Sequence, residues 1–143
     1  MKKTTKIILA ASLAIATTFT VRCNLNHAIV DEAVSKVMIA EKMLYRRGDY
    51  ERIISLDATA KGRIIKALLN GHVFHYYFVK SVCFGGVYFI DDSGEELLDV
   101  SAFKGNVIRI DRTYIELSDD FLTVCGFSSE AARKVFQSKS GAK

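Results

Sequence analysis

The chain has 143 residues, half of them hydrophobic, with 20 Lys and Arg against 16 Asp and Glu. This composition excludes an intrinsically disordered protein, because such chains are poor in apolar residues. Much of the net positive charge lies at the N-terminus, so the rest of the chain lacks the concentrated basic surface of a nucleic-acid-binding protein.

The N-terminal segment is typical of a bacterial secretory signal. Three lysines within the first six residues precede an apolar run, Ile7–Ala16, and small and polar residues follow it. The uncharged stretch ends at Val21 after 15 residues, short of the roughly 20 that a membrane-spanning helix needs. We therefore expect residues 1–22 to be a signal peptide, the membrane to be contacted only through this segment, and the protein to be periplasmic or secreted.

Two alternatives remain for this segment: an uncleaved membrane anchor, and a lipoprotein attached through Cys23. Arg22 argues against the lipoprotein, because a lipid-attachment site has a small residue before its Cys. Cleavage after Ala16 would leave 127 residues with 17 basic and 16 acidic side chains. Such a length is ordinary for one domain, and we treat residues 23–143 as a single domain close to neutrality.

The first part of this domain is predicted to be helical. Apolar residues recur at spacings of three and four from Asn26 to about Arg47, with acidic residues in the first turn and basic residues in the last. This pattern predicts a long helix that ends at Gly48. Asp49 would cap a short second helix, and Asp57 would cap a third over Ala58–Leu69.

Strand formers dominate after Gly71, where aromatic and β-branched residues become frequent. Gly85-Gly86 is interpreted as a tight hairpin turn. The alternative is a turn at Lys80-Ser81, with the two glycines forming a β-bulge. After a further turn at Asp91–Gly94, strands are predicted at Glu95–Val100, Asn106–Ile110 and Thr113–Leu117.

The end of the chain contains a loop or single helical turn through Phe121 and Leu122, and then a last helix, Glu130–Ser138. Helices followed by strands at this spacing predict an α+β fold. We expect N-terminal helices packed on an antiparallel β-meander of four to five strands, with a short C-terminal helix.

Three cysteines occur in the chain, and in an oxidising compartment two of them tend to pair. Cys83 and Cys125 lie within predicted structure, so we expect a disulfide between them. The alternative is two buried free thiols. Cys23 is then the odd cysteine, either free or in an intermolecular disulfide.

The side chains that often carry chemistry do not form a trusted motif. His72 and His75 are three residues apart, and in a strand they would point to opposite faces, which argues against a shared metal ion. Cys125 has no nucleophile motif around it. Adjacent acids in turns are usually solvated rather than tuned for acid–base catalysis. We predict no catalytic residue, no metal and no cofactor.

An acidic segment is the clearest candidate for function. No Lys or Arg occurs between Lys80 and Lys104, an interval that holds five acidic residues. An acidic hairpin tip could enter a basic groove on a partner, because opposite potentials steer encounter and fix register. The alternative is a solvated turn that protects a sheet edge from aggregation. The candidate partner-binding residues are Asp91, Asp92, Glu95, Glu96 and Tyr88.

Aromatic residues provide a second candidate. Both faces of the segment His72–Lys80 are apolar, so a sheet face there could receive a ligand, a partner or a second copy in a homodimer. The candidate pocket residues are Tyr76, Tyr77 and Phe78. The alternative is a sheet covered by helices on both faces.

The sequence therefore favours an exported binding protein without catalytic activity, of the periplasmic inhibitor or immunity type. Its expected partner is a protein, such as an enzyme with a basic groove. Two alternatives remain: a ligand-binding or accessory envelope protein with an aromatic-lined pocket, and a small exported hydrolase that uses acidic residues, or Cys125 with a His.

Overall fold

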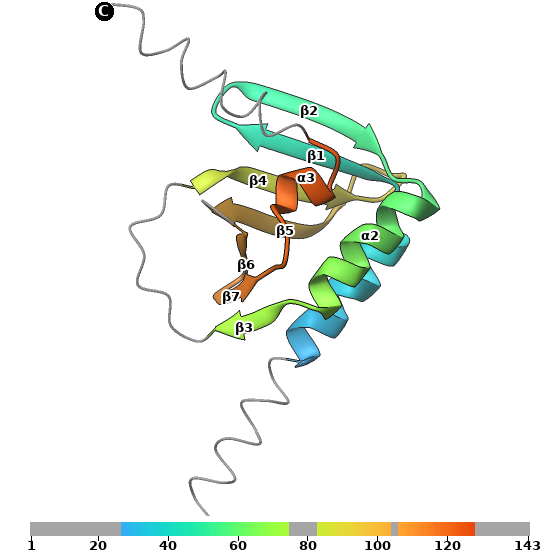
Figure 1. Ribbon diagram of the computed structural model, residues 1–143. Helices are drawn as coiled ribbons and strands as arrows, with labels where there is room; N and C mark the ends of the chain where they lie inside the picture. Colours follow the sequence, from blue (N-terminus) through green and yellow to red (C-terminus); the bar gives the residue numbers. More distant parts are fainter. Residues whose placement is uncertain (1–26, 75–82, 104–105, 128–143) are drawn as a thin grey trace, which may run out of the picture.

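The computed structural model describes residues 27–74, 83–103 and 106–127 (Figure 1). Within this part, the chain begins with an N-terminal helix at residues 27–39 and ends with the short helix α3, Phe121–Val124. The elements between them are β1 (Lys42–Arg47), β2 (Tyr50–Ser55), α2 (Ala58–Leu69), β3 (His72–Phe74), β4 (Cys83–Ile90), β5 (Glu96–Phe103), β6 (Val107–Ile110) and β7 (Thr113–Glu116). None of the described helices is long and apolar enough to cross a membrane.

The strands form one antiparallel sheet of seven strands in the order β2-β1-β4-β5-β6-β7-β3. The expected α+β class is confirmed, but the expected four to five strands are too few. Strands β4 to β7 pair in chain order, the β1–β2 hairpin extends the sheet beyond β4, and β3 extends it beyond β7. The two edges are therefore β2 and β3.

One face of the sheet is covered by helices. The N-terminal helix contributes Val30, Ala33 and Val37 to the core, and α2 contributes Ala60, Ile64 and Leu68. Both sets recur at spacings of three or four, so each helix turns a single apolar stripe toward the sheet. The two helices lie side by side, and Lys61 Nζ donates a hydrogen bond of 3.0 Å to the Met38 carbonyl (Figure 1).

Helix α2 begins and ends as its sequence predicts. The Asp57 carboxylate accepts a hydrogen bond of 2.7 Å from the Ala60 backbone N–H, which satisfies one of the free donors of the first turn. Asn70 lies at the C-terminal end, where its backbone N–H donates back to the Lys66 carbonyl. Local capping signals and the apolar stripe agree here, so the local sequence was sufficient.

The predicted first and second helices are wrong beyond residue 39. The chain from Lys42 to Ser55 forms the β1–β2 hairpin, and Gly48 adopts a φ of +57° in its turn. Met43 and Tyr45 are buried two residues apart, which is the period of a strand. Met43 also fits the helical spacing of the preceding residues, and this coincidence hid the change from helix to strand.

The expected hairpin turn at Gly85-Gly86 is also wrong, and the irregularity that the alternative predicted for the glycines is found in β4. Strand β4 continues through both glycines, with a shift of register between Cys83 and Gly85. Gly85 has a φ of +124°, and a Cβ atom there would lie 2.6 Å from the Arg46 carbonyl oxygen. Glycine is required because neither the backbone angle nor the available space accepts a side chain.

Other predictions fall outside the described residues, namely the turn at Lys80-Ser81 and the last helix, Glu130–Ser138. The predicted strands at Glu95–Val100, Asn106–Ile110 and Thr113–Leu117 correspond to β5, β6 and β7. The predicted helical turn at Phe121 is α3.

Replacement of Gly85 by Ala should lower the free energy of unfolding by about 1–3 kcal/mol, because it forces a strained backbone against the Arg46 carbonyl. Gly62→Ala is the matched control. Gly62 lies within α2 with nothing within 4 Å of an added Cβ, so the change should stabilise the protein by about 0.5–1 kcal/mol. Urea denaturation measures both; equal effects of the two substitutions would contradict the role given to Gly85.

Candidate functional site

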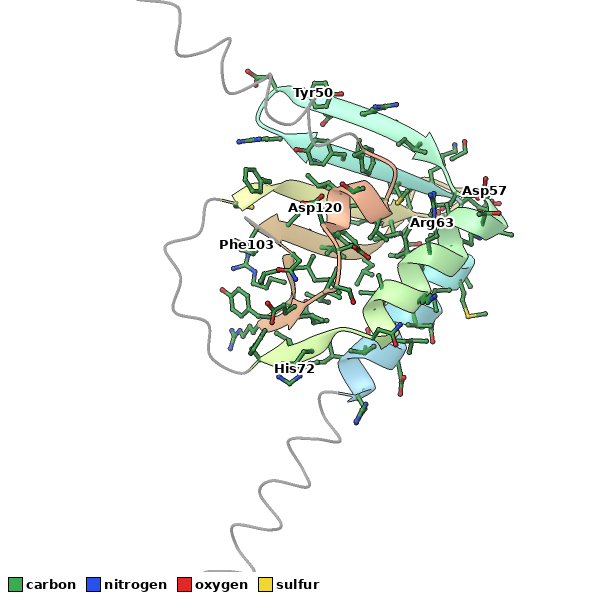
Figure 2. The ribbon with its side chains drawn as sticks, in the orientation of Figure 1. Tyr50, Asp57, Arg63, His72, Phe103 and Asp120 are labelled. Carbon is green, nitrogen blue, oxygen red and sulfur yellow. The ribbon has the colours of Figure 1, made fainter. Side chains whose placement is uncertain are left out.

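The predicted acidic turn lies at one end of the sheet, between β4 and β5. Two backbone hydrogen bonds fix its surroundings: Glu41 N–H donates to the Ile90 carbonyl at 2.8 Å, and Leu56 N–H donates to the Glu41 carbonyl at 2.9 Å. The end of the N-terminal helix, the end of β2 and the end of β4 therefore meet at the same place. The start of α2 follows directly, and Asp57 marks it in Figure 2.

Asp91 holds the turn in shape. Its carboxylate Oδ1 accepts hydrogen bonds from the Ser93 hydroxyl at 2.7 Å and from the Glu95 backbone N–H at 2.8 Å. These bonds favour the charged form, so they lower the pKa of Asp91, with the Ser93 hydroxyl as the larger cause. Gly94 completes the turn with a φ of +89°. The turn is thus ordered before any partner arrives.

Asp92, Glu95 and Glu96 remain exposed around this framework. Among the described residues, none of the three has a hydrogen bond or ion pair from its side chain. Their carboxylates are therefore available to a partner.

A shallow groove of about 640 Å³ lies beside the turn. Its lining combines apolar and charged residues: Ile39, Glu41, Lys42, Ser55, Leu56 and Asp92. Ile39 is 62% exposed, and its neighbour Met38 is 60% exposed, which is unusual for large apolar side chains. We call this surface the acidic end and define it as Met38, Ile39, Glu41, Asp91, Asp92, Glu95 and Glu96.

Three cations of the described residues lie near the acidic end. Lys61 Nζ lies 3.8 Å from a Glu41 carboxylate oxygen, so it offsets part of that charge. Lys42 lines the groove together with Glu41 and Asp92. Arg46 is close enough to Glu96 for electrostatic attraction. The five carboxylates of the acidic end still outnumber these cations.

Tyr88 lies apart from the turn. It pairs with Leu44 and Asp99 across the neighbouring strands, and these positions share the sheet face opposite the buried Val87 and Phe89. The Arg46 guanidinium lies 5.3 Å from the Tyr88 ring centroid and also bonds Glu51 at 2.6 Å. The structure therefore brings the four predicted acids together and places Tyr88 on the outer face of the sheet, beneath a cation.

Sequence reasoning missed Ile39, Glu41 and Leu56. It placed the first two within a helix that continued to Arg47, and the third within a second helix. A reading of Gly48-Asp49 as a two-residue hairpin turn would have ended the helix earlier, and it was the available signal.

The predicted aromatic pocket residues Tyr76, Tyr77 and Phe78 lie outside the described residues, as does His75. Other aromatic residues do gather on the outer face. The rings of Phe103 and Tyr114 are 5.8 Å apart, and the Arg109 guanidinium lies 5.6 Å from the Phe103 centroid. His72 is exposed in β3 with its ring 5.0 Å from that of Phe74.

The expected disulfide is not formed: Cys83 and Cys125 are both free thiols. Their environments differ, since Cys83 is exposed at the start of β4 and Cys125 is only 2% exposed beside α3. Burial raises the pKa of the Cys125 thiol well above its ordinary value. Cys125 is therefore a packed apolar side chain, in line with the free-thiol alternative for this residue.

Within residues 27–74, 83–103 and 106–127, no group of three or more His, Cys, Asp or Glu side chains is arranged to hold a metal ion. Comparison of the chain with protein-family models, with curated proteins and with solved structures finds no match.

Asp91→Asn should destabilise the protein at pH 7. The Asp91 carboxylate is a charged acceptor of two hydrogen bonds, and a neutral amide accepts the same bonds more weakly. The folded-state pKa of Asp91 is depressed, so its contribution is present above the ordinary value of 3.8 and is lost as the pH falls through the folded value. Urea midpoints of wild type and variant should therefore converge as the pH falls below 3.8 and through the lowered folded-state pKa.

The control for this prediction is Asp92→Asn, which removes the same charge from the same turn without removing those hydrogen bonds. It should shift the urea midpoint less than Asp91→Asn at pH 7. A gap between Asp91→Asn and wild type that does not narrow at any pH below the ordinary value of 3.8 would contradict the role of the Asp91 charge.

The two described cysteines should differ in reactivity. Cys83 should react with N-ethylmaleimide in the native protein, whereas Cys125 should react only after unfolding, because its sulfur is buried and its thiolate is disfavoured. Peptide mass mapping of native and urea-unfolded samples reads each residue separately. If neither cysteine reacts with N-ethylmaleimide until a reducing agent is added, the two form a disulfide instead.

Proposed function

We propose that this protein is an exported, non-catalytic binding protein that contacts a basic surface of a protein partner through its acidic end. The observation that carries the proposal is an exposed, pre-ordered turn of carboxylates beside a groove with exposed Ile39. The signal peptide predicted at residues 1–22 supports action in the periplasm or outside the cell. The class that fits is an inhibitor or immunity-type protein.

Pre-ordering favours binding at this surface. Association costs free energy for each loop and side chain that must become ordered, and the turn is already fixed by Asp91. The free carboxylates of Asp92, Glu95 and Glu96 would steer a basic partner toward the turn and set its orientation.

The apolar residues supply the other part of an interface. Met38 and Ile39 offer surface that gains from removal from water, while the acids around them form a polar rim. The complementary partner surface is concave enough to receive the narrow Ser93-Gly94 tip, carries Lys or Arg, and has an apolar patch beside them. A substrate cleft that binds anionic substrates has this chemistry, which is why an enzyme is the proposed target.

A second candidate is a ligand-binding or accessory envelope protein that uses the outer face of the sheet. It is favoured by the half-exposed rings of Tyr88, Phe103 and Tyr114. Arg46 and Arg109 already lie against two of these rings and occupy part of that face. A hydrolase with Cys125 as nucleophile is not supported, because the raised pKa of this thiol keeps it protonated near neutral pH.

Charge reversal tests the proposal. The tagged, exported protein is used for affinity capture from its native envelope extract, and the partner is identified by mass spectrometry. Asp92→Lys combined with Glu95→Lys should weaken binding of that partner by about tenfold or more at low salt, because like charges would then face each other.

The matched control carries the same charge change elsewhere: Asp31→Lys combined with Glu116→Lys, two exposed positions outside the acidic end. It should retain the partner. Equal affinity of both double variants, each folded by circular dichroism, would exclude the acidic end as the binding surface.

A further inference from the structure

A second groove, of about 400 Å³, runs between α2 and α3. One wall is a single stripe of α2, and the other comes from the connection after β7 and from α3 (Figure 2). We call it the α2 groove; its lining is Arg63, Lys66, Ala67, Asn70, Ser118, Asp119, Thr123 and Val124. The α2 residues fall at spacings of three and four, so they share one face of the helix.

The cations of the α2 groove are unpaired. Within the described part of the chain, no carboxylate lies within 4 Å of the Arg63 guanidinium or the Lys66 ammonium. Asp120, at the base of α3, is already engaged by the Thr123 backbone N–H at 3.0 Å and by the Thr123 hydroxyl at 3.2 Å. Asp119 is the one acidic residue in the lining.

The charges of this groove are opposite in sign to those of the acidic end. Arg63 and Lys66 line the groove, whereas Asp91, Asp92, Glu95 and Glu96 surround the β4–β5 turn. The same chain thus presents both a groove with two free cations and a turn with free carboxylates.

We infer that the α2 groove receives the β4–β5 turn of a second copy of this chain. The inference rests on the proposed function, because it uses the same acidic end. Asp92 and Glu95 flank a tip of two small residues, Ser93 and Gly94, which gives the turn a narrow profile. Arg63 and Lys66 are neighbours on the helix surface, about 5–6 Å apart at Cβ, so both can form charge-assisted hydrogen bonds with carboxylates of one turn.

Apolar surface is matched on the two sides as well. Four large apolar side chains are exposed in the described residues: Met38 and Ile39 lie at the acidic end, Leu69 lies three residues beyond Lys66 on α2, and Ile53 lies in β2, outside both surfaces. When the turn enters the groove, Met38, Ile39 and Leu69 are positioned to meet at its margin and exclude water from the ion pairs.

The contact joins two different surfaces, because one copy donates its turn and the other copy offers its groove. The turn of a given chain is fixed beside Glu41 and the start of α2, whereas the groove lies further along α2 at residues 63–70. Each copy can therefore give and receive at once, in a closed reciprocal pair or in a head-to-tail assembly. Assembly occupies the acidic end and competes with any other partner for it.

Sedimentation velocity of the full exported chain tests this inference with two complementary double variants. The turn variant is Asp92→Lys with Glu95→Lys; the groove variant is Arg63→Glu with Lys66→Glu. We expect wild type to associate as its concentration rises and salt to reverse this association, since screening weakens surface charges. Each variant alone should be monomeric.

Mixing the two variants gives the sharpest result. The turn variant offers a basic groove and a basic turn, and the groove variant offers an acidic turn and an acidic groove, so each should associate with the other although neither associates alone. A single chain carrying all four reversals should associate again, with the charges exchanged. The pair Asp31→Lys and Glu116→Lys is the control and should associate like wild type.

A monomeric wild type at every concentration, a mixture that stays monomeric, or association that persists in the groove variant would overturn the inference. The proposed function is read separately by envelope capture. If the groove variant captures the outside partner and the turn variant does not, the acidic end binds that partner whatever the state of self-association. If both variants still capture the partner, the acidic end does not bind it and the proposed function is excluded.

Discussion

The antiparallel pairing of β1 with β4 is the interaction on which the rest of this structure depends. It joins the β1–β2 hairpin to the strands β4 to β7, and it sets Met43 beside Phe89 and Tyr45 beside Val87 in the centre of the core. The same pairing brings the Arg46 carbonyl against Gly85, which leaves room only for glycine. Next to this pairing, the Glu41 backbone N–H donates a hydrogen bond to the Ile90 carbonyl. This bond holds the acidic turn beside the end of the N-terminal helix.

The core and the charged surface are cleanly separated. No polar or charged residue is buried among those that the structure describes, and the large buried side chains are all apolar. Even the partly buried Tyr45 hydroxyl donates a hydrogen bond of 2.6 Å to the Phe84 carbonyl. Folding therefore rests on burial of apolar area, and the exposed carboxylates of the acidic end can change without the cost of an unpaired buried charge.

Sequence alone predicted the elements whose signals are local. Helix α2 was correct because Asp57, the apolar stripe and Asn70 all lie within its own segment. The β1–β2 hairpin was missed because its strand character depends on β4, more than forty residues away in the chain. Period-two burial of Met43 and Tyr45 becomes evident only when that partner strand is present.

The same distinction governs the candidate site. Four acids close together in the chain suffice to predict an acidic turn, so Asp91, Asp92, Glu95 and Glu96 could be identified directly. Ile39, Glu41 and Leu56 join them only through the backbone bonds that close the end of the sheet. Tyr88 is close to the turn in the sequence but does not lie on the same surface. Side chains alternate along β4, so the Tyr88 ring lies on the outer face of the sheet.

The acids of the turn also divide their roles, and this division explains why the turn suits recognition. Asp91 uses its charge within the turn, on the Ser93 hydroxyl and the Glu95 N–H, and this lowers its pKa. Because one carboxylate supplies the order, Asp92 and Glu95 are held in place without making internal bonds from their own side chains. A partner with cations at the right spacing, such as the Arg63 and Lys66 pair, then meets charges that are both free and fixed. A flexible acidic loop would lose part of the same Coulomb attraction to the entropy of its own ordering.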